Sequence, residues 1–133
     1  MNSNVMRQDM DAESFKASVH PLLKAHGFKR NGATWRREQD ESIAVFNVQK
    51  SGWGGGVFYI NVGVYFRAIG PEVAPTENRC HVRTRLEFGE PSLVQTTAIS
   101  WFDARATLAQ ARALAEQDSK HGLVFKELRN FAA

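Results

Sequence analysis

Hydrophobic residues recur at two different spacings along this chain, and each spacing predicts one type of element. Between residues 11 and 28 apolar positions recur every three or four residues, which predicts a helix with acidic residues in its first turn. Gly27 is expected to end this helix in a left-handed conformation, with Phe28 folded back on the last turn. Pro21 is expected either to kink the helix or to begin a second segment, and His26 is expected on its apolar face.

The middle of the chain alternates with period two, which is typical of strands. Strands are predicted over residues 33–38, 42–50, 57–67 and 80–86, with a further edge strand over residues 93–102. A glycine-rich loop at residues 51–56 joins the second strand to the third. A helix capped by Asp103 and a short terminal helix after Gly122 complete the pattern. The prediction is a single α+β domain over residues 11–133, preceded by a disordered tail at residues 1–10.

The predicted antiparallel sheet has about four to five strands and is covered on one face by the N- and C-terminal helices. The face toward the helices is expected to carry Phe46, Val48, Phe58, Ile60, Val62, Val64, Phe66 and Val82. The opposite face is expected to be bare, with Ile43 and Val45 at one end. With the tip of the glycine-rich loop, this face supplies the candidate partner-binding residues, which are Asn47, Gln49, Trp53, Tyr59, Asn61, Tyr65, Arg67, His81, Arg83 and Arg85.

Charge becomes informative once it is placed on this face. The 133 residues include 17 Lys and Arg against 14 Asp and Glu, a net charge of only +3. No acid occurs between Ser42 and Pro71, so the excess is local. Tyr and Arg are enriched at binding hot spots, and Asn and Gln supply adaptable hydrogen bonds. A solvated sheet face whose polar pairs only stabilise the fold is the alternative.

Chemistry-bearing residues give little support to an enzyme. The single cysteine, Cys80, excludes a disulfide framework or a zinc site built on several cysteines and favours a reducing, cytoplasmic compartment. Adjacent strand residues point to opposite faces, so Cys80 is expected in the core as a structural residue and His81 on the surface, kept neutral by nearby arginines. The candidate acids for a paired-carboxylate site all fall at turns or strand ends; they are Glu38, Asp40, Glu41, Glu72, Glu77, Glu87 and Glu90. No metal, cofactor or membrane span is expected.

Several segments, taken in series, resemble the bacterial "domain of unknown function forty-three-oh-four" family. They are the helix end Leu22 to Gly32, the strand at Trp35-Arg36-Arg37, the strands Phe46 to Ser51 and Phe58 to Phe66, and Cys80 to Leu86, with Trp101 as a further point. The resemblance runs from about Phe15 to Leu86. It implies a small bacterial cytoplasmic α+β protein and assigns no activity.

These features predict a non-catalytic binding protein that docks a macromolecule through the polar sheet face. Small single-domain bacterial proteins of this architecture often act as immunity or antitoxin proteins, and the basic face favours a protein partner, such as a toxin, with an acidic patch. A single-stranded nucleic-acid or nucleotide-binding module is the alternative, with arginines on phosphates and tyrosines stacked on bases. A third hypothesis is an enzyme on a phosphorylated small molecule, with His81 as acid or base.

Overall fold

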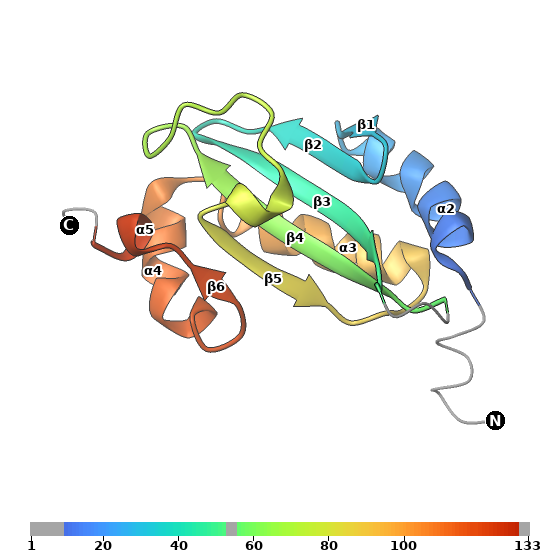
Figure 1. Ribbon diagram of the computed structural model, residues 1–133. Helices are drawn as coiled ribbons and strands as arrows, with labels where there is room; N and C mark the ends of the chain where they lie inside the picture. Colours follow the sequence, from blue (N-terminus) through green and yellow to red (C-terminus); the bar gives the residue numbers. More distant parts are fainter. Residues whose placement is uncertain (1–9, 53–55, 131–133) are drawn as a thin grey trace.

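The computed structural model describes residues 10–52 and 56–130, which form an antiparallel sheet and the helices around it (Figure 1). The elements in chain order are α2 (Ala12–Ala25), β1 (Lys29–Asn31), β2 (Thr34–Glu38), β3 (Ser42–Lys50), β4 (Phe58–Phe66), η1 (Glu77–Arg79), β5 (Val82–Leu86), α3 (Pro91–Asp103), α4 (Leu108–Asp118), β6 (Leu123–Val124) and α5 (Lys126–Asn130). The predicted α+β class is confirmed. The expected tail at residues 1–10 lies almost wholly outside the described residues.

The first helix begins where the sequence predicts. The Asp11 carboxylate accepts a hydrogen bond from the Ser14 N–H at 2.8 Å and so caps the first turn of α2. Glu13 in that turn makes ion pairs with Lys16 at 2.8 Å and Lys50 at 3.0 Å. Hydrogen bonds from these two ammonium groups lower the pKa of Glu13 to about 2. The pair with Lys50 ties the start of α2 to the end of β3.

The end of α2 also agrees with the prediction. Gly27 has a φ of +86°, and its N–H donates to the Lys24 carbonyl while the Phe28 N–H donates to the Leu23 carbonyl. This pair of bonds is the Schellman arrangement, in which glycine avoids the cost of a left-handed side-chain residue. Pro21 lies inside the continuous helix. His26, expected on the apolar face, is instead the exposed residue at the end of the helix.

The six strands of the described residues follow each other across the sheet in chain order, each antiparallel to the next. The four strands predicted within residues 33–86 are present: β3 has the predicted bounds, and β2, β4 and β5 are one or two residues shorter than predicted. The pattern missed β1 and β6, the two edge strands, because three or two residues are too few to show alternation.

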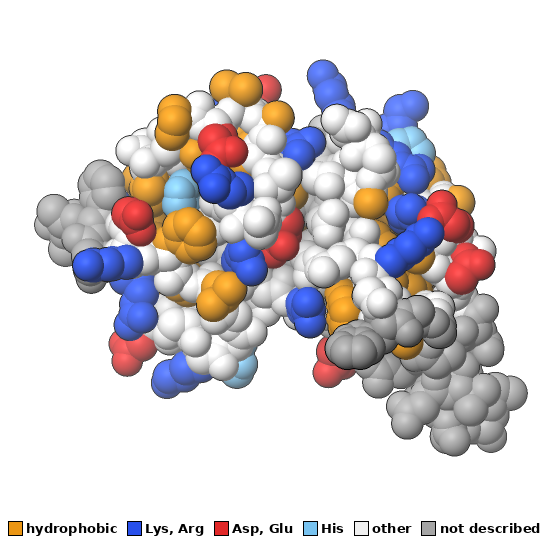
Figure 2. All heavy atoms as spheres, viewed as in Figure 1, with side chains coloured by type: hydrophobic (Ala, Val, Ile, Leu, Met, Phe, Trp, Pro, Cys, Tyr) orange, Lys and Arg blue, Asp and Glu red, His pale blue; other side chains and the backbone are white. Residues whose placement is uncertain are grey.

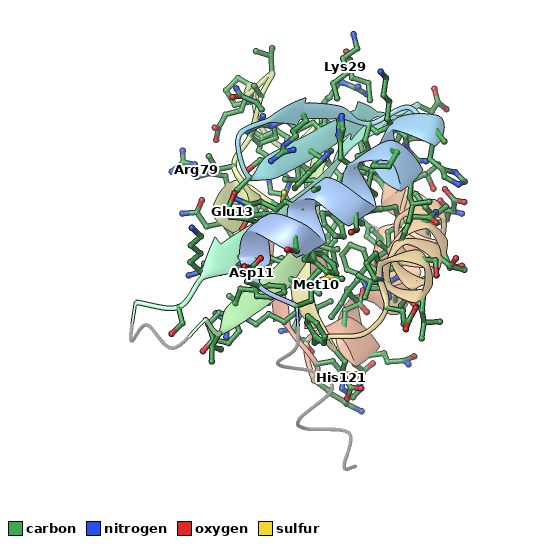
Figure 3. The ribbon with its side chains drawn as sticks, turned by 90° about the vertical axis from the view of Figure 1, so that its right-hand side faces the viewer. Met10, Asp11, Glu13, Lys29, Arg79 and His121 are labelled. Atoms are coloured by element: carbon green, nitrogen blue, oxygen red, sulfur yellow. The ribbon has the colours of Figure 1, made fainter. Side chains whose placement is uncertain are left out.

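The helices cover one face of the sheet. In Figure 1 α3 lies behind the sheet, and in Figure 3 α2 and α3 lie on one side of it while the segment with Arg79 lies on the other. The covered face is the expected one: the buried core takes in Phe46, Val48, Ile60, Val62, Val64, Phe66 and Val82, with Phe58 partly buried against it. Among the described residues, no helix is long and apolar enough to cross a bilayer.

The prediction of an edge strand over residues 93–102 is wrong, since this segment is α3. Pro91 occupies the start of the helix, where its missing N–H costs nothing. Val94, Ala98 and Phe102 recur every four residues and are buried on the core. The β-branched residues between them suggested a strand, and burial of one helical stripe overrides that local preference.

Asp103, expected to cap the next helix, ends α3 and makes an ion pair with Arg37 at 3.0 Å. The residue that caps α4 is Thr107. Its hydroxyl accepts from the Gln110 N–H, and the Gln110 side chain accepts from the Thr107 N–H, which makes a complete capping box.

Candidate binding surface on the sheet

The polar face of the sheet is covered at one end, so the expectation of a wholly bare face is wrong. Residues 67–81, between β4 and β5, cross this face and include η1, which lies in front of the sheet in Figure 1. Beneath them Ile43, Val45 and Tyr65 form a second, smaller buried cluster with Cys80 of the crossing segment. We call these four residues, with Gly63, the covered end of the polar face.

Cys80 belongs to this covered end rather than to the helix side, where it was expected. β5 begins at Val82, so its alternation does not extend back to Cys80. The cysteine packs on Gly63: a Cβ at Gly63 would lie 2.7 Å from the Cys80 Cβ. The Cys80 side chain is buried, and burial raises the pKa of its thiol far above the ordinary value. These features fit a structural cysteine.

His81 is buried, contrary to the expectation that it faces solvent. Its side chain is 4% exposed and lies against Tyr65, with ring centroids 4.4 Å apart, and against Phe125 at 5.6 Å. Its Nδ1 accepts a hydrogen bond from the Phe66 N–H at 2.9 Å. The pKa of His81 is lowered, as expected. The cause is burial of the ring and not the neighbouring arginines that were expected to act. The residue ties β4 to the segment that leads into α5.

Two of the three candidate arginines are engaged within the protein. Arg83 donates to the Asn78 carbonyl at 2.7 Å and pairs with the Glu77 carboxylate at 3.5 Å, so it holds η1 on the sheet. Arg67 donates to the carbonyls of Gln39 and Asp40, at 2.9 and 3.0 Å, and pairs with Glu38. Tyr65 is 2% exposed, and its hydroxyl accepts from the Glu72 N–H. These three side chains fasten loops to the sheet.

The uncovered part carries a row of polar residues across four strands. The register places Thr34 opposite Asn47, Asn47 opposite Asn61, and Asn61 opposite Arg85. Asn47 donates to the Thr34 hydroxyl at 3.1 Å, and Asn61 donates to Asn47 at 3.1 Å and to Gln49 at 3.0 Å. Arg85 Nε donates to Asn61 Oδ1 at 3.3 Å. The amides therefore satisfy each other and hold the row in one arrangement.

The row ends in a cation stacked on an aromatic ring. The Arg85 guanidinium lies 4.0 Å from the centroid of the Tyr59 ring. Tyr59 is paired with Gln49 in the register, and Gln49 and Arg85 are exposed. We call Thr34, Asn47, Gln49, Tyr59, Asn61 and Arg85 the open end of the polar face. Figure 2 shows this side of the molecule, with uncharged polar groups and backbone over its middle and charged side chains mostly around them.

Glu77 supplies a negative charge at this surface that the alternation of the strands does not predict. Its side chain is 13% exposed, and burial raises the pKa of its carboxyl against the opposing effect of Arg83 and Arg85. The positive charge of the open end therefore comes mainly from Arg85. Thr34 is the second residue of this surface that was not predicted. Its place beside Asn47 depends on the β2–β3 register, which the sequence pattern does not determine.

Of the ten candidate residues, Asn47, Gln49, Tyr59, Asn61 and Arg85 lie together at the open end. Tyr65 belongs to the covered end, His81 is buried against it, and Arg67 and Arg83 bond to loops. Trp53 lies outside the described residues. At the base of its loop a hollow of about 250 Å³ is lined by residues from α2, β3 and the loop, which are Asp11, Ala12, Glu13, Lys50, Ser51, Gly56 and Val57.

An antiparallel meander with helices on one face and a hydrogen-bonded polar row on the other defines the class: an α+β protein with an exposed polar sheet surface. The chain belongs to the family described as a domain of unknown function (DUF4304), whose model matches residues 19–121. The match confirms the resemblance and extends it beyond Leu86 and Trp101 to His121, just after α4. No curated protein and no solved structure matches the chain.

Proposed function

We propose that this chain is a protein-binding module that docks a protein partner through the open end of its polar face. The Arg85–Tyr59 stack is the observation that carries the proposal. Arg and Tyr are the residue types that dominate interface energetics, and here they already lie together on an exposed part of the sheet. In this role the chain needs no chemistry of its own.

Preorganisation strengthens this assignment. Arg85 is held by Tyr59 on one side and by Asn61 on the other, and Asn61 is itself fixed by Asn47 and Gln49. A side chain that is already ordered loses less conformational entropy when a partner binds. The guanidinium Nη groups of Arg85, the Gln49 amide nitrogen and the Tyr59 hydroxyl have no hydrogen-bond partner among the described residues, which leaves them for a ligand.

The geometry favours a protein over a single-stranded nucleic acid. A nucleic-acid surface needs several cations along the backbone path and several open aromatic faces. Arg67 and Arg83 are engaged in ion pairs, and Tyr65 is buried. Of the candidate arginines and tyrosines, only Arg85 and Tyr59 are left for a ligand, and the Arg85 guanidinium covers one face of the Tyr59 ring.

The partner that fits this surface is polar and presents a carboxylate to Arg85, rather than a broad acidic patch, because Glu77 lies nearby. An immunity or antitoxin protein of a bacterial cytoplasm is the form of binding module that we propose. The lone buried thiol of Cys80 is compatible with such a reducing compartment.

The test is capture of the purified products of the neighbouring genes by the wild-type protein and by Arg85→Glu. The charge reversal is expected to weaken binding at least tenfold, since it places like charges opposite each other. Lys120→Glu, which makes the same charge change at an exposed residue after α4, is the matched control and is expected to leave the affinity within twofold.

Equal binding of every captured partner by the wild type and Arg85→Glu would exclude the open end as the interface. Low-salt titration with single-stranded DNA and RNA is the companion experiment. Tight binding that falls steeply with added salt would overturn the protein-binding assignment in favour of nucleic acid.

A further inference from the structure

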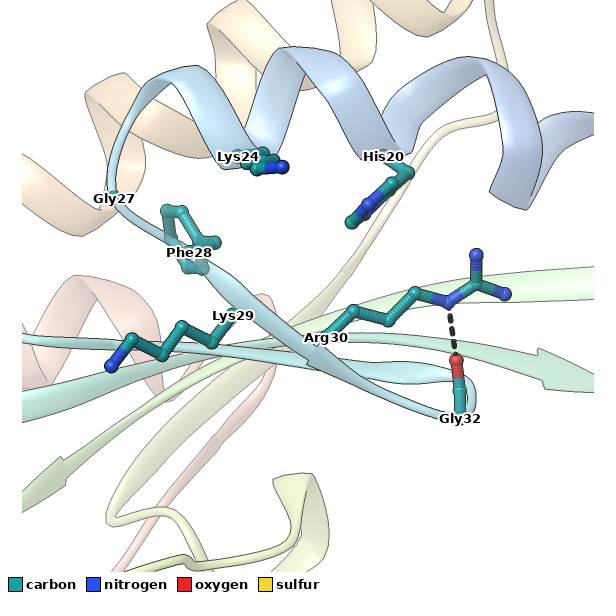
Figure 4. A pocket seen from close by; sticks show the side chains of 7 residues that line it. All are labelled: His20, Lys24, Gly27, Phe28, Lys29, Arg30 and Gly32. Atoms are coloured by element: carbon teal, nitrogen blue, oxygen red, sulfur yellow. Dashed lines mark hydrogen bonds between the residues drawn. The ribbon is translucent and has the colours of Figure 1, made fainter.

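The edge strand β1 lies between two hollows. The larger has a volume of about 600 Å³ and is lined by residues of α2 and of the β1–β2 hairpin, which are His20, Lys24, Gly27, Phe28, Lys29, Arg30 and Gly32 (Figure 4). The smaller, of about 370 Å³, shares Gly27, Lys29 and Arg30 with it and adds Arg36 and Glu38, among others. A volume of several hundred cubic ångströms is within the usual range for a small-molecule site. We call the larger hollow the basic cavity.

No carboxylate belongs to the lining of the basic cavity. Lys24 and Lys29 make no ion pair with any residue that the structure describes. The acidic first turn of α2 lies at the opposite end of the helix, as the positions of Glu13 and Lys29 in Figure 3 show. The lining of the basic cavity itself is therefore positively charged.

The side chains of this cavity present hydrogen-bond donors. Trp35 Nε1–H can only donate, and it donates to His20 Nδ1 at 3.1 Å, so the proton of the neutral His20 ring is on Nε2. Arg30 uses its Nε for the Gly32 carbonyl at 2.7 Å and keeps its two Nη groups. The same Trp35 ring lies 4.9 Å from the Arg30 guanidinium, and this fully buried indole therefore orients both neighbours.

Helix stabilisation accounts for only part of this cluster. A cation in the last turn of a helix interacts favourably with the helix dipole, which explains Lys24. Lys29 and Arg30 lie on β1, where that interaction does not reach. Cations on an edge strand also discourage pairing with another chain, but that role does not require a hollow or a donor from His20.

We infer that the basic cavity binds an oligophosphate anion, either free or as the phosphate chain of a nucleotide. Lys24, Lys29 and Arg30 supply the positive charge, and His20 Nε2 supplies a neutral donor. Lysine and arginine bind phosphate oxygens through charge-assisted hydrogen bonds, and a ligand with several negative charges gains from several cations at once. The assignment is independent of the open end, which lies on other strands.

The test is titration of the full chain with inorganic phosphate, pyrophosphate, tripolyphosphate and ATP at low salt, followed by amide chemical shifts in residues 20–32. Affinity is expected to rise from phosphate to tripolyphosphate and to fall with added salt. The double variant Lys24→Ser/Lys29→Ser, at two exposed residues, is expected to lose at least tenfold in affinity for tripolyphosphate. Lys120→Ser/Lys126→Ser removes the same charge elsewhere and is expected to lose less than twofold.

Tighter binding of ATP than of tripolyphosphate would support the inference and identify the ligand as a nucleotide. Equal or weaker binding of ATP would support it and identify the free oligophosphate. An absence of shifts in residues 20–32, or an equal loss of affinity in the two double variants, would overturn it. Circular dichroism of both variants shows whether the fold is kept.

Discussion

The two ends of the polar sheet face share the same strands and the same alternation, yet they are used in opposite ways. At the covered end Ile43, Val45 and Tyr65 are buried beneath residues 67–81. At the open end Asn47 and Asn61 occupy the equivalent side of the same two strands and bond to each other. The apolar side chains are removed from water by the overlying segment, whereas the paired amides need no cover because their hydrogen bonds are satisfied.

Arginines differ between the two ends in the same way. Arg83 and Arg85 are two residues apart on β5 and point to the same face. Arg83 bonds to η1, while Arg85 stacks on Tyr59 and remains exposed. A charged residue on a sheet face therefore either holds a loop on the sheet or remains available to a partner, depending on whether a loop crosses over it.

Close packing at the covered end predicts the largest effect. Gly63→Ala would bring a Cβ within 2.7 Å of Cys80 Cβ and 2.9 Å of its Sγ, so the overlying segment must move. We expect the free energy of unfolding to fall by about 1–3 kcal/mol in urea denaturation. Gly52→Ala, where no atom lies within 4 Å of the added Cβ, is the control and should change it by less than about 0.5 kcal/mol. Equal stability of both variants would contradict this packing.

The amide row predicts a smaller loss at the open end. Asn61 is 4% exposed and bonds to Asn47, Gln49 and Arg85. Asn61→Ala removes these bonds and is expected to lower the free energy of unfolding by about 1–2 kcal/mol. Gln49→Ala, at an exposed residue with one of these bonds, should cost less than about 0.5 kcal/mol. If both changes cost the same, the row does not act as a unit.

The sequence predicted the part of the fold that depends on local periodicity. The period of α2, its glycine end and the alternation of β3 and β4 follow from spacing alone, and each is confirmed. Residues 91–103 suggest a strand because β-branched and aromatic residues are frequent among them, although Val94, Ala98 and Phe102 form the buried stripe of a helix. Which stripe is buried depends on the rest of the core, and a local pattern does not contain that information.

The candidate site shows the same limit. Alternation placed Asn47, Asn61 and Arg85 on one face, and the register brings them into one row. It also placed Tyr65 and Arg83 there, and could not show that residues 67–81 return over them. The predicted strand over residues 80–86 begins two residues too early, because Cys80 and His81 precede β5 and do not follow its alternation. A loop that covers a sheet is a long-range feature, and it decides which polar residues are exposed.

The pair of arginines allows the two ends to be separated in one experiment. Arg83→Gln removes the bond to Asn78 and leaves the mostly buried Glu77 carboxylate without its ion pair, so we expect a loss of about 1 kcal/mol in unfolding free energy. Arg85→Gln should change stability by about 0.5 kcal/mol or less, because Arg85 is exposed. Partner affinity should respond in the opposite order. A larger stability loss for Arg85→Gln than for Arg83→Gln would contradict the assignment of Arg83 to loop attachment and of Arg85 to partner binding.

The smallest effect is expected from the titration of His81, which lies against Tyr65 of the covered end, because Glu127 and Glu72 oppose the effect of burial that lowers its pKa. The unfolded chain binds a proton near the ordinary pKa of 6.5, while folded His81 binds it only at lower pH. The contribution of His81 to the free energy of unfolding is therefore complete above pH 6.5, and it is lost as the pH falls from 6.5 through the pKa of His81 in the folded protein. Urea denaturation between pH 7.5 and about pH 5 measures the slope of the free energy of unfolding against pH.

A matched pair of variants assigns that slope to one residue. His81→Gln keeps an acceptor for the Phe66 N–H but does not titrate, so the part of the slope below pH 6.5 that His81 causes should disappear. His26→Gln changes an exposed histidine and should keep the slope. If the two variants show the same slope, the acid sensitivity of the covered end does not come from His81, and the carboxylates near it become the groups to test.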